Sequence, residues 1–185
     1  MAKLLRNPGP MAERLRQATA ELQRKTVKVG WFESAKYEDG TSVAYVASLN
    51  ELGKNARPFM RPTIADRAQV WKSVGKKGAK QVINGEATAG YMFELIGLQA
   101  SGDIAKTITK ITDPPLSPVT LLLRKRKKAG DKITGKTVGE AHREVNFVGP
   151  RRKSDKTLDF SGVSTKPLVD TGIMLNTLTY VVEDK

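Results

Sequence analysis

The stretch KPLVDTG, residues 166–172, contains the strongest indication of chemistry in the chain. Two apolar residues followed by Asp-Thr-Gly are typical of the aspartic protease loop, where two Asp carboxylates share a proton and activate water. Such a protease needs a second loop of this kind, but the sequence has no other Asp-Thr-Gly, and only 13 residues follow Gly172. We therefore predict that Asp170, Thr171 and Gly172 form a structural turn, because Asp bonds to nearby backbone and Gly tolerates positive φ.

Other catalytic and metal-binding groups are scarce. The chain has no cysteine, which excludes disulfides, thiolate metal sites and a cysteine nucleophile, and His142 is its single histidine. Paired carboxylates such as Glu33 with Asp39, or Asp103 with Asp113, are expected to be surface charges, since no base, metal ligand or phosphate-binding loop accompanies them. The sequence predicts no enzyme, no cofactor and no metal site.

Positive charge dominates the composition. Lys and Arg number 32 against 19 Asp and Glu, giving a net charge of +13 and a pI near 10.0, so the surface should attract polyanions. Residues 124–153 alone hold eleven basic residues and three acidic ones. The run RKRKK at residues 124–128 has three open interpretations: a solvated helix end, a surface for acidic protein partners, or a DNA contact. Arg124, Lys125 and Arg126 are its candidate interface residues.

Hydropathy gives no sign of a membrane segment. The longest apolar run in the basic half is VTLLL at residues 119–123, whereas spanning a bilayer takes roughly 18 residues or more. Residues 1–10 carry charge and two prolines where a secretory signal has an apolar stretch. We expect no membrane partner and synthesis in a cytoplasm.

The apolar pattern predicts several helices. Residues 11–25 place Met11, Leu15, Ala18 and Leu22 at helical spacing, and residues 41–53 favour a short helix over a strand. Thr63 and Asp66, spaced as a capping box, indicate the start of a long helix. Another helix is expected over about 89–111, with a bend near Ser101, and a short one should start after Ser117 and end by Gly130.

Two strands and a long irregular segment complete the pattern. Residues 26–33 and 178–182 alternate apolar and polar side chains as strands do. Periodicity fades after Gly130, so residues 126–165 are predicted to be a long basic loop or arm, with a β-hairpin as an option. The whole chain, 1–185, is interpreted as a single α+β domain with a mostly antiparallel sheet and flanking helices.

The segment NARPFMRP, residues 55–62, is the best candidate for a partner surface. Its prolines bias Arg57 and Arg61 toward extended backbone. Glu51 could pair with Arg57 or Arg61 within or between subunits, or remain an exposed helix-end charge. Phe59, flanked by arginines, has the character of a buried interface anchor. The arm adds two further candidate anchors, Phe147 and Phe160, whereas Trp31, Phe32 and Trp71 are expected in the core.

Four landmarks occur in one order: VGWFESAKYEDGTSVAYVASLNELG, RPFMRPT, PLSPVTLLLRK and KPLVDTGIMLNTLTYVV. Together they resemble the neck and tail-completion proteins of long-tailed bacteriophages, minor structural proteins at the joint between capsid and tail. The resemblance covers most of residues 27–125 and 166–183. It implies a small twisted sheet with flanking helices, a homo-oligomeric ring of commonly six subunits in the virion, and contacts with other neck, connector and tail proteins. The basic arm departs from the simplest family members.

A basic nucleic-acid-binding protein is the main alternative. The charge suits phosphate contacts, including a DNA contact through the basic stretch. However, aromatic residues make up only 6% of the chain, and none lies between Arg124 and His142. No helix-turn-helix, zinc or RNP pattern is present, so base recognition has little support.

Overall fold

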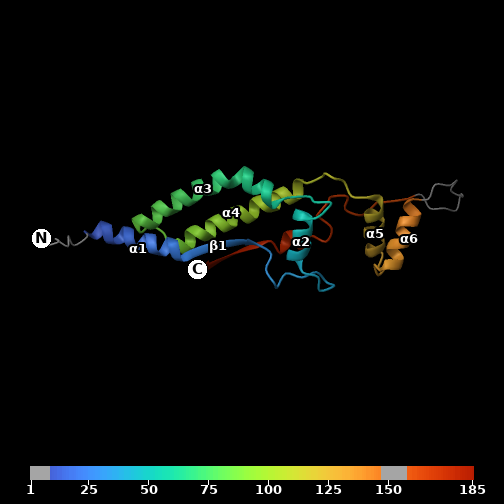
Figure 1. Ribbon diagram of the computed structural model, residues 1–185, viewed down its shortest axis with the longest axis horizontal. Helices are drawn as coiled ribbons and strands as arrows, with labels where there is room; N and C mark the ends of the chain where they lie inside the picture. The colour runs from blue at the N-terminus through green and yellow to red at the C-terminus, as the bar shows by residue number, and fades with distance from the viewer. Residues whose placement is uncertain (1–8, 147–157) are drawn as a thin grey trace. The chain divides into compact units, whose positions relative to one another are not determined.

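The computed structural model describes residues 9–146 and 158–185 (Figure 1). Across these ranges the chain forms seven helices and a two-stranded antiparallel sheet, so the α+β class predicted from the sequence is confirmed. The chain divides into two compact units, whereas the sequence was interpreted as a single domain. Unit 1 contains residues 1–107 and 176–185, and unit 2 contains residues 108–175.

The sheet of unit 1 joins the two ends of the chain. Strand β1 (Lys25–Gly30) pairs antiparallel with β2 (Thr179–Asp184), with Val27 opposite Val182 and Val29 opposite Tyr180. Both strands were predicted from their alternating side chains, and a pair this small needs a helix against it to be stable. Helix α4 (Ala89–Lys110) supplies that support at Gly97, where an added Cβ would lie 2.5 Å from the Tyr180 ring.

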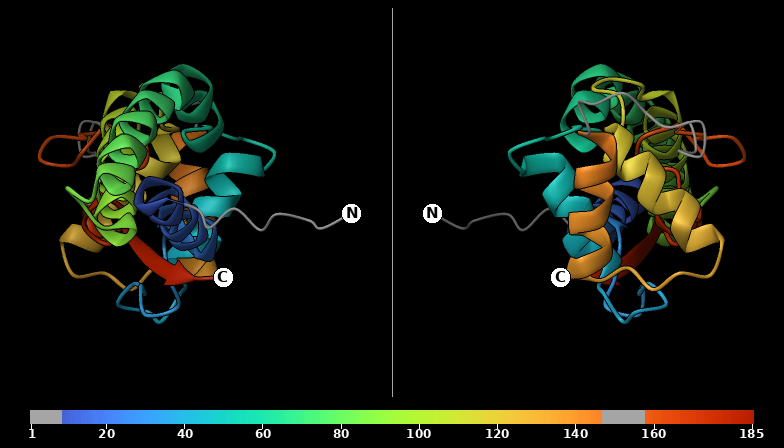
Figure 2. Two further views of the ribbon diagram at one scale, coloured as in Figure 1. Left: turned by 90° about the vertical axis from the view of Figure 1, so that its left-hand side faces the viewer. Right: turned by 90° about the vertical axis from the view of Figure 1, so that its right-hand side faces the viewer.

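Three helices of unit 1 lie side by side over the core (Figures 1 and 2). Helix α1 (Pro10–Arg24) and α3 (Met60–Asn84) pack with α4, and the buried side chains are Ala18, Val82, Ala89 and Met92. The apolar spacing of residues 11–25 thus correctly predicted α1. Gly78 allows α3 to approach Met92, since a Cβ there would lie 2.3 Å from the Met92 Cγ.

Helix α2 (Val43–Leu52) confirms the helical interpretation of residues 41–53. The Ser42 hydroxyl caps it by accepting a hydrogen bond from the Tyr45 N–H. At its other end the Gly53 N–H donates to the Leu49 carbonyl, and a Cβ on Gly53 would lie 2.3 Å from that oxygen. Gly53 therefore ends the helix where the sequence predicted.

Helix α3 begins earlier than its predicted capping box. The sequence placed the start at Thr63, with Asp66 closing the box, but the helix starts at Met60. Pro62 fits in the first turn because the N–H groups there have no carbonyl partner within the helix, so the N–H that proline lacks is not needed. The predicted start was wrong because the cap comes from a residue distant in sequence, Glu51.

Unit 2 contains a helical hairpin. Helix α5 (Pro118–Lys128) is capped by Ser117 as predicted, and it packs against α6 (Gly135–Val145). The sequence interpretation of residues 126–165 as a loop or arm was wrong at residues 126–128, which end α5, and at α6, which has a reciprocal cap between Thr134 and Thr137 and buries Ala141. Residues 147–157 of that predicted arm, with its optional hairpin, lie outside the described residues. A short helix, α7 (Ile173–Asn176), precedes β2.

Candidate functional site

Two clusters of hydrogen bonds and ion pairs link landmarks that are separate in the sequence, and each is called a brace here. The first brace lies in unit 1 and consists of Glu51 with residues 59–61. The Glu51 carboxylate accepts hydrogen bonds from the backbone N–H groups of Phe59, Met60 and Arg61, at 2.7, 2.9 and 3.1 Å. These donors belong to the first turn of α3, where N–H groups have no partner inside the helix and the helix dipole favours an anion. Glu51 of the NELG landmark therefore caps the helix that RPFMRPT begins.

Arg61 closes the same brace from the other side. Its Nε donates to the Glu51 carboxylate at 2.9 Å, and its Nη2 donates to the Glu51 backbone carbonyl at 2.8 Å. Burial alone would raise the pKa of Glu51, but the three backbone N–H groups and the Arg61 guanidinium outweigh it and hold that pKa below its ordinary value. Of the two pairings that the sequence left open, the one with Arg61 is present within one chain. The Arg57 N–H donates to the Asn50 carbonyl at 2.7 Å.

Phe59 is buried inside unit 1 and does not lie on its surface. Its ring is fully buried and meets Trp31 edge to face, with ring centroids 5.6 Å apart and planes at 86°. Trp31 lies near the start of the landmark that ends in NELG, so this contact is a second link between that landmark and RPFMRPT. The burial does not fit the prediction of Phe59 as an interface anchor, since its surface is already covered by its own chain.

The second brace lies in unit 2 and centres on Arg124. Its side chain is only 11% exposed, and its Nη1 donates to the backbone carbonyls of Ser164 and Lys166 at 2.7 and 3.0 Å. Its Nε lies 3.4 Å from the Asp170 carboxylate. An arginine fork suits several acceptors at once, which a lysine cannot match. Arg124 thus ties the PLSPVTLLLRK landmark to KPLVDTG.

The Asp-Thr-Gly segment is a turn, as the sequence predicts. Gly172 has φ +78°, a region that favours glycine, and its carbonyl accepts from the Leu175 N–H at 3.0 Å. The Thr171 hydroxyl, and not the Asp170 carboxylate, accepts from the Ile173 N–H. The Asp170 contact that the structure gives is the ion pair with Arg124. The predicted role of Asp170 as the cap of the turn is therefore corrected to that of a charge partner.

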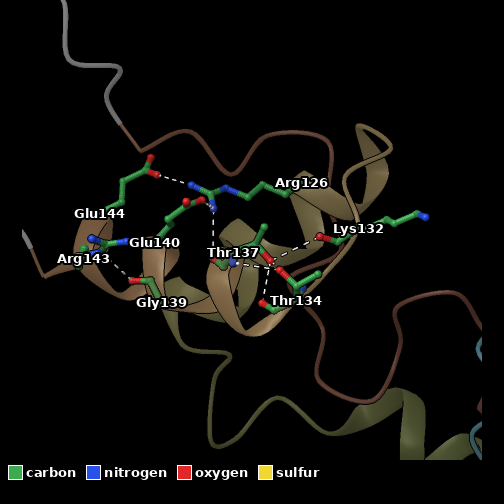
Figure 3. Close-up of polar contacts among 8 residues, drawn as sticks. All are labelled: Arg126, Lys132, Thr134, Thr137, Gly139, Glu140, Arg143 and Glu144. Atoms are coloured by element: carbon green, nitrogen blue, oxygen red, sulfur yellow. Dashed lines mark hydrogen bonds and ion pairs between the residues drawn. The ribbon is translucent and has the colours of Figure 1, made fainter.

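The rest of the basic run also contacts its own unit. Lys125 donates to the Asp159 backbone carbonyl at 2.8 Å and also to the Asp159 carboxylate. The hydrogen bond to the carboxylate, together with those from Ser161, lowers the pKa of Asp159 to about 2. Arg126 binds Glu144 at 2.7 Å on α6 and approaches Glu140 (Figure 3). Four of the five basic side chains hold unit 2 together, since Lys128 donates to the Gly162 carbonyl at 2.7 Å.

A surface pocket of about 320 Å³ opens beside the second brace. Its lining residues include Lys127 and Lys128 of α5 and the turn residues Asp170 and Thr171. Lys127 is exposed and has no ion-pair partner in the described part of the chain. Of the two predicted anchors in the arm, Phe160 is half-buried, and Phe147 lies outside the described residues.

One buried carboxylate was missed by the sequence reasoning. Asp103, predicted to be a surface charge, is buried in unit 1, where it accepts hydrogen bonds from Trp71 Nε1 and Gln99 Nε2, both at 3.0 Å. Burial raises its pKa, but these bonds, with Arg67 and Lys106 nearby, bring it below the ordinary value. The available signal was the helical alignment of Asp103 with Gln99. The bond to Trp71 ties α4 to α3.

Metal-binding clusters and membrane-spanning helices are both absent from the described ranges. Residues 9–146 and 158–185 contain no group of three or more His, Cys, Asp or Glu side chains that could hold a metal ion. In the same ranges no helix is both long and apolar enough to cross a membrane.

Comparisons with known proteins add no relative. No protein-family model, no curated protein and no solved structure matches the chain.

Proposed function

We propose that the protein is a structural subunit of the neck or tail end of a long-tailed bacteriophage. In this proposal it forms a homo-oligomeric ring, with six subunits as the expected number, that completes the tail and joins it to the capsid connector. Its partners are other copies of itself and the neighbouring neck, connector and tail proteins. It is made in the cytoplasm of the bacterial host and acts in the virion, without catalysis or a cofactor.

The observation that carries the proposal is that the four landmarks of the resemblance meet in two internal braces. Glu51 links NELG to RPFMRPT, and Arg124 links PLSPVTLLLRK to KPLVDTG. The spacing of these motifs therefore has a structural reason. Each motif holds a helix end or a turn in place, which suits a protein whose function is to present surfaces for assembly.

The nucleic-acid-binding alternative has less support. Four side chains of the RKRKK run donate hydrogen bonds to carbonyls or carboxylates of their own unit: Arg124, Lys125, Arg126 and Lys128. The run therefore offers fewer free positive charges to phosphates than its sequence suggests. Lys127 is the member of the run that stays exposed without a partner in the described residues.

Two measurements test the proposal. Electron microscopy of the purified protein should reveal rings, and mass spectrometry of particles from the phage that encodes the chain should detect it as a minor virion component. Its absence from purified infectious particles would overturn the assignment. Binding to double-stranded DNA with a steep salt dependence, in a protein absent from particles, would favour the alternative.

A further inference from the structure

The outer face of α2 is apolar although it faces solvent. Tyr45, Leu49 and Leu52 recur at helical spacing and are 59%, 49% and 70% exposed. The opposite face buries Val43, Ala47 and the Glu51 carboxylate of the first brace. Glu51 is the one charged residue of α2, so no charge lies on the outer face of a helix from a chain in which 28% of residues are charged.

Such a helix is incomplete without a neighbour. A contiguous apolar patch exposed on a polar surface marks a protein interaction site. Burying each leucine of the stripe would stabilise a complex by roughly 1.5 kcal/mol or more, from the area removed from water. The outer face of α2 therefore has the properties of a receptor for another apolar helix.

The N-terminal half of α1 has the matching properties. Its apolar stripe runs through Met11, Leu15, Ala18 and Leu22, but only the second half of the stripe is covered by the core. Met11 and Leu15 are 67% and 48% exposed. Within unit 1 this half of α1 extends away from α2 (Figure 1), so it is not placed to cover the α2 of its own chain.

Charge favours the same pairing. The turn just before α2, residues 33–40, carries Glu33 and Glu38, which have no ion-pair partner in the described residues. Arg14 follows Met11 by three residues and therefore flanks the exposed stripe of α1. Opposite charges beside two apolar surfaces guide the approach and fix the orientation.

We propose that the outer face of α2 receives the N-terminal half of α1 from a second copy of this chain. Met11 and Leu15 of one copy lie against Tyr45, Leu49 and Leu52 of the next, and Arg14 lies near the acidic turn. One surface meets a different one, so the contact is head-to-tail and repeats around a closed ring. This inference rests on the ring assembly proposed above and names the surfaces that form it.

The absence of cysteine from the natural chain permits a direct test. Leu15→Cys and Leu52→Cys are made as separate single variants, mixed, and treated with a short bismaleimide. We expect a covalent dimer in the mixture and not in either variant alone. A dimer of equal yield from Leu52→Cys alone would mean that α2 pairs with itself, and it would overturn the proposal.

A matched pair of substitutions provides a second readout. Leu49→Lys places a positive charge inside the apolar contact with Met11 and Leu15 of the next copy, and it should weaken self-association in sedimentation experiments by about tenfold or more. Ile64→Lys is the control, because Ile64 on α3 is as exposed as Leu49, at 48% against 49%, and lies outside both surfaces. Equal effects of the two changes would overturn the inference.

The outcome is separable from that of the proposed function. Rings without the cross-link between residues 15 and 52 would show that the assembly uses other surfaces. A protein that stays monomeric at every concentration would overturn this contact for the free chain, whereas virion composition tests the function independently.

Discussion

At the scale of single residues, the Glu51 carboxylate is expected to stabilise the fold, because it caps α3 and pairs with Arg61. Glu51→Gln keeps one acceptor oxygen but removes the negative charge from the start of α3 and from Arg61. We expect a loss of about 1 to 3 kcal/mol in the free energy of unfolding, measured by urea titration. Glu94→Gln, on the exposed side of α4, is the control and should change stability by less than about 0.5 kcal/mol.

The lowered pKa of Glu51 makes this contribution depend on pH. Because the folded value lies below the ordinary one of 4.5, the stabilisation is complete above that ordinary value and is lost as the pH falls through the folded value. The difference in unfolding free energy between wild type and Glu51→Gln should therefore be larger at about pH 7 than at about pH 3. A difference that does not change with pH would show that the charge is not the source of the effect.

Arg124 and Asp170 form an ion pair, but we expect Arg124 to contribute more to the stability of unit 2 than Asp170 does. Arg124→Ala leaves several carbonyls without their donor, so it should destabilise unit 2 by about 2 to 3 kcal/mol. Asp170→Asn should cost at most about 1 kcal/mol, because the Asp170 side chain is 43% exposed and solvent screens the pair. Lys127→Ala is the neutral control, and thermal unfolding is the measurement. Cleavage of an unfolded substrate that disappears in Asp170→Asn without a change in melting temperature would restore the protease interpretation.

At the scale of elements, two glycines of α4 should respond in opposite directions to the same change. Gly97→Ala puts a Cβ within 2.5 Å of the Tyr180 ring and 2.9 Å of Val27, so it should push the sheet from the helix and cost about 1 to 3 kcal/mol. Gly102→Ala meets nothing within 4 Å and should stabilise the helix by up to about 1 kcal/mol. Urea unfolding of both variants compares a packing glycine with a merely flexible one.

The elements also show what the sequence could and could not predict. Helix α1 and both strands follow from apolar periodicity, and Ser117 and Gly53 mark helix ends through local backbone bonds. The start of α3 was missed because its cap, Glu51, comes from another helix. Helix α6 was missed because Thr134 and Thr137 form a cap without an acidic residue, and because its burial depends on docking against α5.

The sequence identified residues of the candidate site better than it identified their hydrogen-bond partners. Glu51 with Arg61 was anticipated as a pair, yet the three backbone donors that make it a cap were not. Arg124 was expected to face a partner, but it binds carbonyls of its own unit about 40 residues further along the chain. Contacts between distant segments leave no periodic pattern in a sequence, so such braces become visible only in the fold.

At the scale of the whole molecule, we expect the two units to make different contacts in the assembly. Unit 1 has the larger core and carries both surfaces of the inferred ring contact, α1 and the outer face of α2. Unit 2 carries the helical hairpin and much of the positive charge. We expect unit 2 to contact a neighbouring neck or tail protein with an acidic surface, because its exposed cations would guide that approach.

A deletion can test this expectation without breaking either brace. Lys128 Nζ lies 2.7 Å from the Gly162 carbonyl, so a short Gly-Ser link can replace residues 131–161 and still reach Gly162. Ser164, Lys166 and Asp170 remain in the variant to hold Arg124. Unit 1 should keep its urea-unfolding transition and the cross-link between residues 15 and 52, while complementation of a phage lacking the wild-type gene should fail. Particles of normal infectivity from the deletion variant would show that residues 131–161 are dispensable for assembly, and would contradict the expected role of this part of unit 2.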